Sequence, residues 1–301
     1  MTSTINLFRL PYLATTEVLR NMDLGELIEI SRISKKSFKY VHGLFSRKNI
    51  GQFKLNVYLS DQFSIGITSV NTTSQGYTEF NVNHLSKLTT EVLENMTKLL
   101  NYPVIVWKIT KVCSQTRSLM ALVQSLNLRT DEVIVRQRDA NAEMLDDIMK
   151  LCTNSKKASI DWKTPESFLL DETLYQPFYL DLLCIRQASW VTVSVVTKLF
   201  MNCKRIFIHG NTSKPRDITE FIKKWIVQPK IERIFIDCES KSIPEILAGI
   251  PSEQVHSFVR NEIEIDLPER TCYKVRGFNG QEAAVFYLRN QIVLSADYHL
   301  L

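Results

Sequence analysis

The chain has 301 residues, of which 45% are apolar and 23% are charged, and its formal net charge is +5. This composition is typical of a globular protein with a sizeable core, in one large domain or in a small and a larger one. No segment approaches the ~20 consecutive apolar residues of a membrane helix, so we expect no membrane partner. The basic residues form no long block, and their densest group, within 32 to 48, is interpreted as a solvated helix face, the alternative being a docking surface for an acidic partner.

The early segment "FRLPYLATTEVLRNM", at residues 8 to 22, lacks the features of a secretory signal. Arg9, Glu17 and Arg20 interrupt its apolar residues, and no basic stretch and cleavage site flank it in order. The six cysteines lie far apart, without the spacing of a zinc ribbon or a small disulfide framework. We therefore expect a cytoplasmic and/or nuclear protein whose cysteines are reduced and mostly buried.

Three short helices are predicted within residues 8 to 48. Pro11 stands where the first helix begins, Asp23 can cap the second, and Ser31 or Ser34 can begin the third. Helices this short bury their own apolar faces poorly, so the segment is expected to need a partner.

The run "LPYLATTEVLRNMDLGELIEISRISKKSFKYV" resembles an F-box, in which Leu-Pro is followed by an apolar pair, Leu-x-x-Leu and a third helix with serine and lysine. F-boxes dock onto the Skp-family adaptor of cullin-RING ubiquitin ligases, so the resemblance implies that adaptor, and through it a cullin, as partners. The positions implied to carry the interface are Leu10, Pro11, Val18, Leu19, Met22, Leu24, Leu27, Ser31, Ile33, Ser34 and Lys35.

One position departs from the F-box pattern. Ser37 stands where many F-boxes have tryptophan, which removes a large aromatic side chain from the third helix, although Phe38 can supply bulk. In the other interpretation, residues 8 to 48 are simply the first helices of a larger domain.

Residues 52 to 83 predict a short antiparallel meander, because β-branched and aromatic runs alternate with turn sequences. A helix with one apolar face follows from about Ser86. Further on, the pattern apolar-x-x-apolar-x-apolar recurs at a regular interval, with amphipathic stretches between the copies. Its middle positions are Val133, Ala158, Leu183, Ile206 and Ile234. Such a series predicts parallel strands joined by crossover helices.

These repeats resemble leucine-rich repeats, which implies a curved parallel sheet. They are degenerate, because only Asn211 stands where that family places Asn or Cys, while Ala188 and Glu239 occupy the equivalent positions elsewhere. Residues 163 to 176 are predicted to form a loop in place of one helix. Asn279-Gly280, between alternating runs, predicts a hairpin that caps the open end of the repeats.

The predicted fold class is α/β, with a small N-terminal three-helix F-box at 1–50 and a second domain at 51–301. The second domain comprises an antiparallel meander (51–83), a degenerate leucine-rich-repeat-like α/β solenoid with a curved parallel sheet (84–252) and terminal strands with an antiparallel hairpin (253–301). This order resembles the F-box-associated domain (type 2) architecture expanded in nematodes, on the pattern "RIFIHG…ITEFIKKWI…IERIFID" and the terminal hairpin. In that family the second domain is taken to recruit targets.

No pattern of a catalytic or metal site is visible. The glycines match neither the phosphate-binding loop nor the dinucleotide fingerprint, and the five histidines are dispersed. Asp146 and Asp147 look like paired carboxylates, but they lie on the polar side of a helical stripe and are interpreted as solvated. We expect no enzyme activity, no cofactor and no metal.

Strand alternation predicts a target-binding surface. If Ile206 and Ile208 face the helices, the side chains of the opposite register face the other way. These side chains are Arg186, Arg205, Phe207, His209, Arg233, Phe235 and Asp237. Arginine, phenylalanine and histidine together have the composition of a recognition surface. In the other interpretation, the terminal strands pack over this surface and bury it.

The expected function is that of a substrate-receptor subunit of a Skp-cullin-F-box type ubiquitin ligase. It would bind the adaptor through the F-box and a target protein through the repeat domain, for ubiquitin-dependent degradation. The alternative is a non-ligase protein-interaction scaffold of leucine-rich-repeat-like architecture. Nucleic-acid binding is not expected, because the basic residues lack an interleaved aromatic pattern or a known module.

Overall fold

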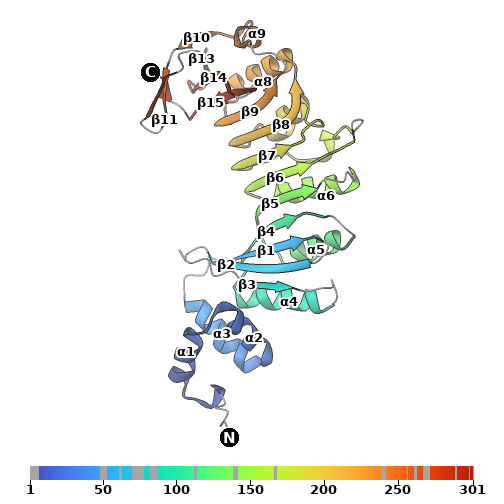
Figure 1. Cartoon of the computed structure of the whole chain (residues 1–301), viewed down its shortest axis with the longest axis vertical. Coiled ribbons are helices and arrows are strands. Elements are labelled where there is room, and N and C mark those ends of the chain that lie inside the picture. Colours follow the sequence, from blue (N-terminus) through green and yellow to red (C-terminus); the bar gives the residue numbers. More distant parts are fainter. Residues whose placement is uncertain are drawn as a thin grey trace. The chain divides into compact units, whose positions relative to one another are not determined.

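A computed structural model describes residues 7–47, 53–60, 63–69, 78–81, 87–111, 114–137, 142–165, 168–238, 242–255, 257–260, 263–266, 272–288, 290–297 and 299–300. The chain divides into two compact units, Met1–Asp131 and Glu132–Leu301. Both contain helices and strands, so the predicted α/β class is confirmed (Figure 1). The predicted domain boundary near residue 50 stays a prediction, because residues 7–47 belong to the same compact unit as the strands that follow them.

The first unit begins with the three short helices expected from the sequence. They are α1 (Tyr12–Arg20), α2 (Leu24–Ile33) and α3 (Lys35–Arg47), preceded by a 3-10 turn, η1 (Leu7–Arg9). Asp23 caps α2 as predicted, since its carboxylate accepts from the backbone N–H of Glu26 at 2.8 Å, and the Glu26 carboxylate accepts from the N–H of Asp23 at 2.9 Å. Leu19, Ile28 and Val41 are fully buried in this N-terminal module, residues 7–47.

The predicted meander is confirmed in the strands that follow. The strands of the first unit are β1 (Phe53–Leu59), β2 (Phe63–Ser69), β3 (Thr78–Asn81) and β4 (Val104–Ile109), and its further helices are α4 (Lys87–Leu99) and α5 (Ser114–Ser125). β1, β2 and β3 are antiparallel neighbours, and β4 pairs with β1 in parallel. Trp107 is fully buried, and its indole N–H donates to the Thr130 hydroxyl at 3.3 Å.

Parallel strands form the core of the second unit. β5 (Thr130–Gln137) begins as the first unit ends, and β6 (Lys157–Trp162), β7 (Leu182–Arg186), β8 (Arg205–Ser213) and β9 (Arg233–Cys238) follow in spatial order. The middle positions of the predicted repeats pair with one another from strand to strand, as in Val133 with Ala158 and Ile206 with Ile234. All five are at most 2% exposed, so the repeat interval indeed marks neighbouring parallel strands.

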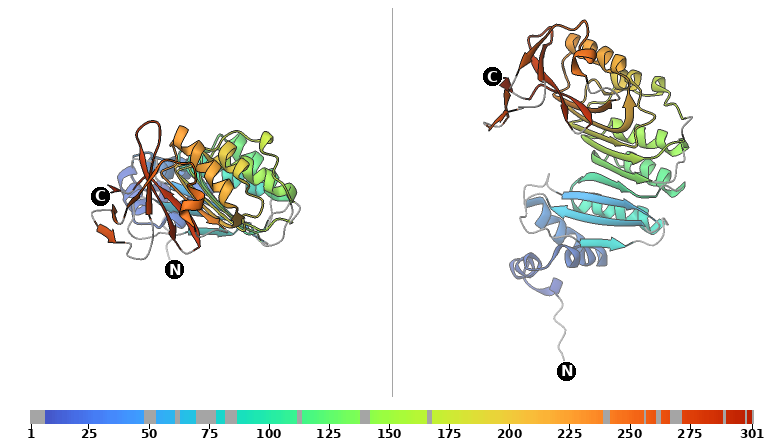
Figure 2. Two further views of the ribbon diagram at one scale, coloured as in Figure 1. Left: turned by 90° about the horizontal axis from the view of Figure 1, so that it is seen from above. Right: turned by 45° about the horizontal axis from the view of Figure 1, so that its top comes forward.

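Helices connect these strands, and α6 and α8 lie on one side of them (Figures 1 and 2). The helices of the second unit are α6 (Ala142–Thr153), α7 (Val193–Val195) with the π-helical η3 (Val196–Phe200), α8 (Pro215–Val227) and α9 (Ile243–Ile246). The buried Trp225 of α8 donates its indole N–H to the carbonyl of Ile231 at 2.9 Å, which ties the helix to the start of β9. The segment 163 to 176 holds only a 3-10 turn, η2 (Glu172–Leu174), as the sequence predicts.

The terminal strands continue the sheet beyond β9. β13 (Cys272–Arg276) and β14 (Glu282–Leu288) form the predicted hairpin, in which Gly280 has φ +84°, a value that favours glycine. β15 (Gln291–Ser295) pairs antiparallel with both β14 and β9, so the terminal strands cover the edge of the last parallel strand, as expected. The remaining strands are β10 (Ser252–Val255), which pairs with β13, and a separate small sheet of β11 (Ser257–Arg260), β12 (Ile263–Asp266) and β16 (His299–Leu300).

The cysteines of the described segments are free, and all but Cys184 are buried, as expected. Desolvation raises the pKa of Cys203 to about 12 and that of Cys272 to about 11, so both are neutral thiols that pack as small apolar side chains. Cys113 lies outside the described residues. Of the helices described, none is long and apolar enough to cross a membrane.

The alternation along β8 predicts a difference between two adjacent substitutions. Ile206 is fully buried, so Ile206→Ala should lower the free energy of unfolding by about 2–5 kcal/mol. Phe207 is only partly buried, so Phe207→Ala should cost less, on the order of 1–2 kcal/mol. Urea unfolding measures both values, and the exposed Arg205→Ala serves as the control with little effect. Equal losses at Ile206 and Phe207 would show that other structure covers the second face.

Candidate functional site

The N-terminal module carries the first candidate surface, and its eleven predicted adaptor-binding positions differ in exposure. Pro11, Val18, Ile33, Ser34 and Lys35 are exposed, and Leu10 and Met22 are partly exposed. Leu19, Leu27 and Ser31 are buried, and the Ser31 hydroxyl donates to the carbonyl of Ile28 at 2.6 Å. The side chain of Leu24 lies outside the described residues. The three buried side chains therefore stabilise the module, and only the exposed members of the set are accessible from outside.

Exposed apolar side chains gather on this small module. Val18 is 40% exposed and Ile33 is 72% exposed, and both belong to the predicted set. Tyr12, at 47%, and Leu13, at 76%, were not predicted, although both lie within the "LPYLATT" run that carries the F-box resemblance. A contiguous exposed apolar patch marks an interaction surface, and these four side chains are the candidates for one on this module.

Ser37, which departs from the F-box pattern, has a structural role at the junction of α2 and α3. Its buried hydroxyl accepts from the backbone N–H of Ser34 at 2.9 Å and donates to the Ser34 carbonyl at 2.8 Å. The Ser34 hydroxyl in turn accepts from the N–H of Ser37 at 3.1 Å. The two serines thus satisfy backbone groups at the turn between the helices, a role that a tryptophan side chain does not have.

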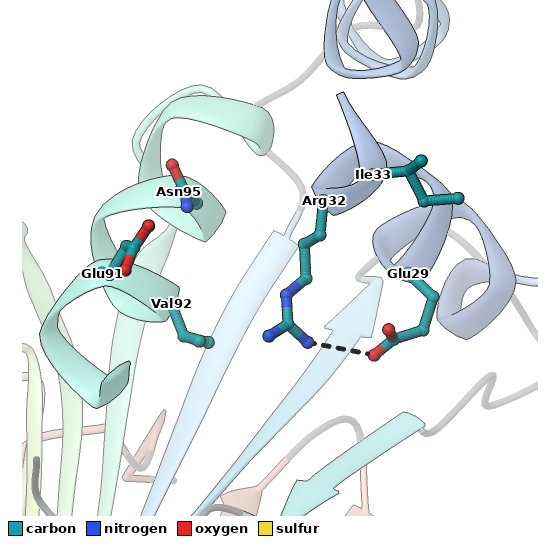
Figure 3. Close-up of a pocket in the computed structure, with 6 residues that line it drawn as sticks. All are labelled: Glu29, Arg32, Ile33, Glu91, Val92 and Asn95. Atoms are coloured by element: carbon teal, nitrogen blue, oxygen red, sulfur yellow. Dashed lines mark hydrogen bonds and ion pairs between the residues drawn. The ribbon is translucent and has the colours of Figure 1, made fainter. Parts of the chain in front are cut away.

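A surface groove of about 360 Å³ lies beside this module, between α2 and α4 (Figure 3). Its lining residues are Glu29, Arg32, Ile33, Glu91, Val92 and Asn95. Arg32 reaches into the space between the helices, where its guanidinium donates to Glu29 at 3.3 Å. The groove is mostly polar, and through Ile33 it adjoins the predicted adaptor surface.

The second candidate surface is the face of the parallel strands that points away from α6 and α8. We name it the open face and define it by the seven predicted target-binding residues, Arg186, Arg205, Phe207, His209, Arg233, Phe235 and Asp237. Ile206, Ile208, Ile234 and Ile236 point to the helices and are buried. Arg186 and Arg205 are exposed, and the other five are partly exposed. The predicted alternation is therefore confirmed.

Strand register brings these residues together in rows. Arg205 lies opposite Arg233, and Phe207 lies opposite Phe235, with the two rings stacked at 4.7 Å between centroids and an interplanar angle of 11°. The Arg233 side chain is only 11% exposed and donates through Nε to Asp297 at 3.1 Å. Arg205 is consequently the more accessible guanidinium of its row.

His209 and Asp237 belong to a hydrogen-bond network that the sequence did not reveal. The amide of Gln291, from β15, donates to Asp237 Oδ1 at 2.7 Å and lies 2.9 Å from His209 Nδ1. Asp237 also accepts from the backbone N–H of Gly210 at 2.6 Å. Gly210 has φ +77°, and a Cβ there would lie 3.1 Å from the backbone of Gln187. Asp237 thus fixes a turn that only glycine fits well.

The Asn211 side chain adds a contact between repeats. Its amide donates to the backbone carbonyl of Val191 in the preceding connection. Asn211 is also the position at which the sequence has the asparagine expected from the repeat pattern.

Side chains on the open-face side of the sheet become more buried from β7 toward β15. Gln291, Val293 and Ser295 of that strand are buried, although they share a face with Asp237, Phe235 and Arg233 through the register. β15 extends the sheet beside β9 and does not pack over the predicted residues, and Arg186 on β7 and Arg205 on β8 are exposed. The strand reads Gln-Ile-Val-Leu-Ser, and because Val293 interrupts any polar alternation, only the pairing of β15 with β9 places Gln291 and Ser295 on this face.

The interpretation of Asp146 on α6 as solvated is wrong, because its carboxylate is partly buried and has partners within the protein. Asp146 accepts from Lys150 at 2.6 Å and from the hydroxyl of Tyr175, which connects α6 to the segment before β7. Burial, followed by this hydrogen bond, raises the pKa of Tyr175 above its ordinary value. In the segments that the structure describes, no three His, Cys, Asp or Glu side chains gather as metal ligands.

Asp237 is hydrogen-bonded within the protein whereas Arg186 and Arg205 are exposed, so their removal should affect stability differently. Asp237→Ala should lower the free energy of unfolding by about 1–3 kcal/mol, because it leaves the partly buried Gln291 amide and the Gly210 N–H without their acceptor. Arg186→Ala and Arg205→Ala should change it by less than about 0.5 kcal/mol, because both side chains are exposed. Urea unfolding of the three variants measures these effects. A similar loss for either arginine variant would place that guanidinium in the supporting network.

Comparison with known proteins adds one match. A family model described as F-box associated matches residues 174–233. The matched segment runs from the end of η2 through β7, β8 and α8 to the first residue of β9, about one fifth of the chain. Neither the curated proteins nor the solved structures yield a match to the sequence. The predicted F-box-associated character of the second domain is thereby supported, and the match lies on the strands that carry Arg186, Arg205, Phe207 and His209.

Proposed function

We propose that this protein is a substrate-receptor subunit of a Skp-cullin-F-box type ubiquitin ligase. The N-terminal module binds the Skp-family adaptor, the second unit binds a target protein, and ubiquitin transfer is carried out by other subunits, so this chain catalyses no reaction itself. The observation that carries the proposal is the F-box-associated match at 174–233, in a chain whose first residues resemble an F-box. The assembly would act in the cytoplasm, the nucleus or both.

The N-terminal module is suited to adaptor binding by its exposed apolar side chains. Val18, Ile33, Tyr12 and Leu13 keep large apolar areas in contact with water, a cost that docking onto an adaptor would remove. The capping box at Asp23 and the serine pair at Ser34 hold α1 to α3 in place without a partner's help at those turns. The interface is therefore attributed to the exposed members of the predicted set.

The second unit is suited to target binding by its open face. The matched segment supplies two of the three strands that present this face, β7 and β8. A sheet that is buried on its helix side by isoleucines is rigid, and a rigid support presents recognition side chains in a fixed geometry.

Adaptor binding can be tested without unfolding the module, because Val18 and Ile33 are exposed in the free chain. Val18→Asp combined with Ile33→Asp should leave the melting temperature nearly unchanged. Docking would bury the two carboxylates against apolar adaptor surface, so adaptor binding should weaken by at least about tenfold. Co-purification of the full chain with the Skp-family adaptor, followed by titration of the purified proteins, measures the loss.

The matched control introduces the same charges outside the N-terminal module. Ser118→Asp with Gln124→Asp, at exposed positions of α5, should bind the adaptor as the unchanged chain does. Undiminished adaptor binding by the Val18 and Ile33 variant would contradict the proposed interface. A wild-type chain that captures target proteins but no adaptor would instead identify a non-ligase scaffold.

A further inference from the structure

The open face has a spacing that matches an extended polypeptide. In the register of β7 and β8, Arg205 lies opposite Leu182 and Phe207 lies opposite Cys184, while Arg186 is four residues beyond Leu182. Because a strand rises about 3.3 Å per residue, Arg205, Phe207 and Arg186 occupy rows about 6.6 Å apart along the strands. An extended segment lying along these strands presents residues i, i+2 and i+4 at the same spacing.

Two exposed arginines stand on these rows. Arg186 and Arg205 are exposed, and no salt bridge within the described part of the chain includes either guanidinium. Two carboxylates share this face: Asp161, opposite Arg186 in the register of β6 and β7, accepts from the Gln187 amide at 2.8 Å, and Asp237 accepts from the Gln291 amide at 2.7 Å. A guanidinium without a carboxylate partner presents a planar set of donors that suits a carboxylate on a bound molecule.

The row between the arginines is apolar. Phe207 and Phe235 stack ring against ring, so each covers a face of the other, and Cys184 and Val293 are their neighbours in the register. Both rings are partly exposed, and the edge of an aromatic ring carries partial positive charge. This arrangement suits an aliphatic side chain flanked by acidic groups, and the mutual stacking takes up one face of each ring that a nucleic-acid base would need.

We propose that the open face binds an extended acidic segment of the target protein. An aliphatic side chain at position i+2 lies over Phe207, and carboxylates at positions i and i+4 bind Arg205 and Arg186. The inference deepens the proposed function, on which it rests, by naming the chemistry of the segment that the receptor recognises.

Selection from a random peptide library tests the spacing. The full chain, immobilised, is exposed to short peptides displayed on phage, and the enriched sequences are read. The expected pattern is acidic-x-aliphatic-x-acidic, in either chain direction. Enriched peptides without acidic residues at this spacing, or no enrichment at all, would overturn the proposal.

Charge reversal then tests the two arginines. A fluorescein-labelled peptide from the selection should bind Arg186→Glu with Arg205→Glu at least about tenfold more weakly than the unchanged chain, and raised salt should weaken its binding to the unchanged chain. Arg216→Glu with Lys223→Glu makes the same change in charge at exposed positions of α8, on the helix side, and should bind normally. Equal binding by the open-face variant, with an unchanged melting temperature, would contradict the inference.

Two further measurements separate this inference from the proposed function and from other occupants. Adaptor binding is measured on the same preparations, so a chain that binds the adaptor but selects no acidic peptide refutes only the inference. A chain that selects the peptides but binds no adaptor refutes only the proposed function. A labelled single-stranded oligodeoxynucleotide whose binding is lost in the open-face variant, without peptide enrichment, would identify a nucleic acid as the occupant and overturn the proposal.

Discussion

The in-register pairing of parallel strands constrains the rest of the second unit. Once Leu183, Ile206 and Ile234 pair across β7, β8 and β9 on the helix side, every other residue of these strands must point to the opposite face. Burial of the isoleucine rows against the helices stabilises this register. The same register places Arg205 beside Arg233 and Phe207 beside Phe235. The candidate target surface is therefore a geometric consequence of the core.

The terminal strands determine how far that surface extends. β15 pairs with the last parallel strand and removes an edge whose free N–H and C=O groups could pair with another chain. It also brings Gln291 and Asp297 to Asp237 and Arg233, so that these two charged residues of the open face become part of the protein's own hydrogen-bond network. Arg186 and Arg205, farther from β15, are exposed.

In the N-terminal module, too, some apolar side chains are buried and stabilise the fold, while others are exposed. Leu19, Leu27 and Val41 form a small interior, and serine and aspartate side chains satisfy backbone groups at the turns. So few buried residues provide a limited core, and the exposed Val18 and Ile33 add nothing to it. A module of this kind gains stability when a partner covers its apolar surface.

The sequence by itself determined the local elements and their order. The three helices with the Asp23 cap, the meander, the repeated parallel strands, the loop at 163 to 176 and the hairpin at Asn279-Gly280 each follow from short-range periodicity or turn chemistry. The sequence also determined that Ile206 and Phe207 point to opposite faces of the sheet, because alternation along a strand needs no tertiary information. These features depend on residues close together in the chain.

Contacts between distant residues were decided only by the tertiary structure. Leu19 and Val18 are adjacent apolar residues, and only helix packing buries the first and exposes the second. The sequence likewise gave no reason to connect Gln291 with Asp237, which are separated by 54 positions, until β15 returned to pair with β9. Periodicity specifies which way a side chain points along its own element, whereas its partners depend on which elements become neighbours in space, and that is set by packing of the whole unit.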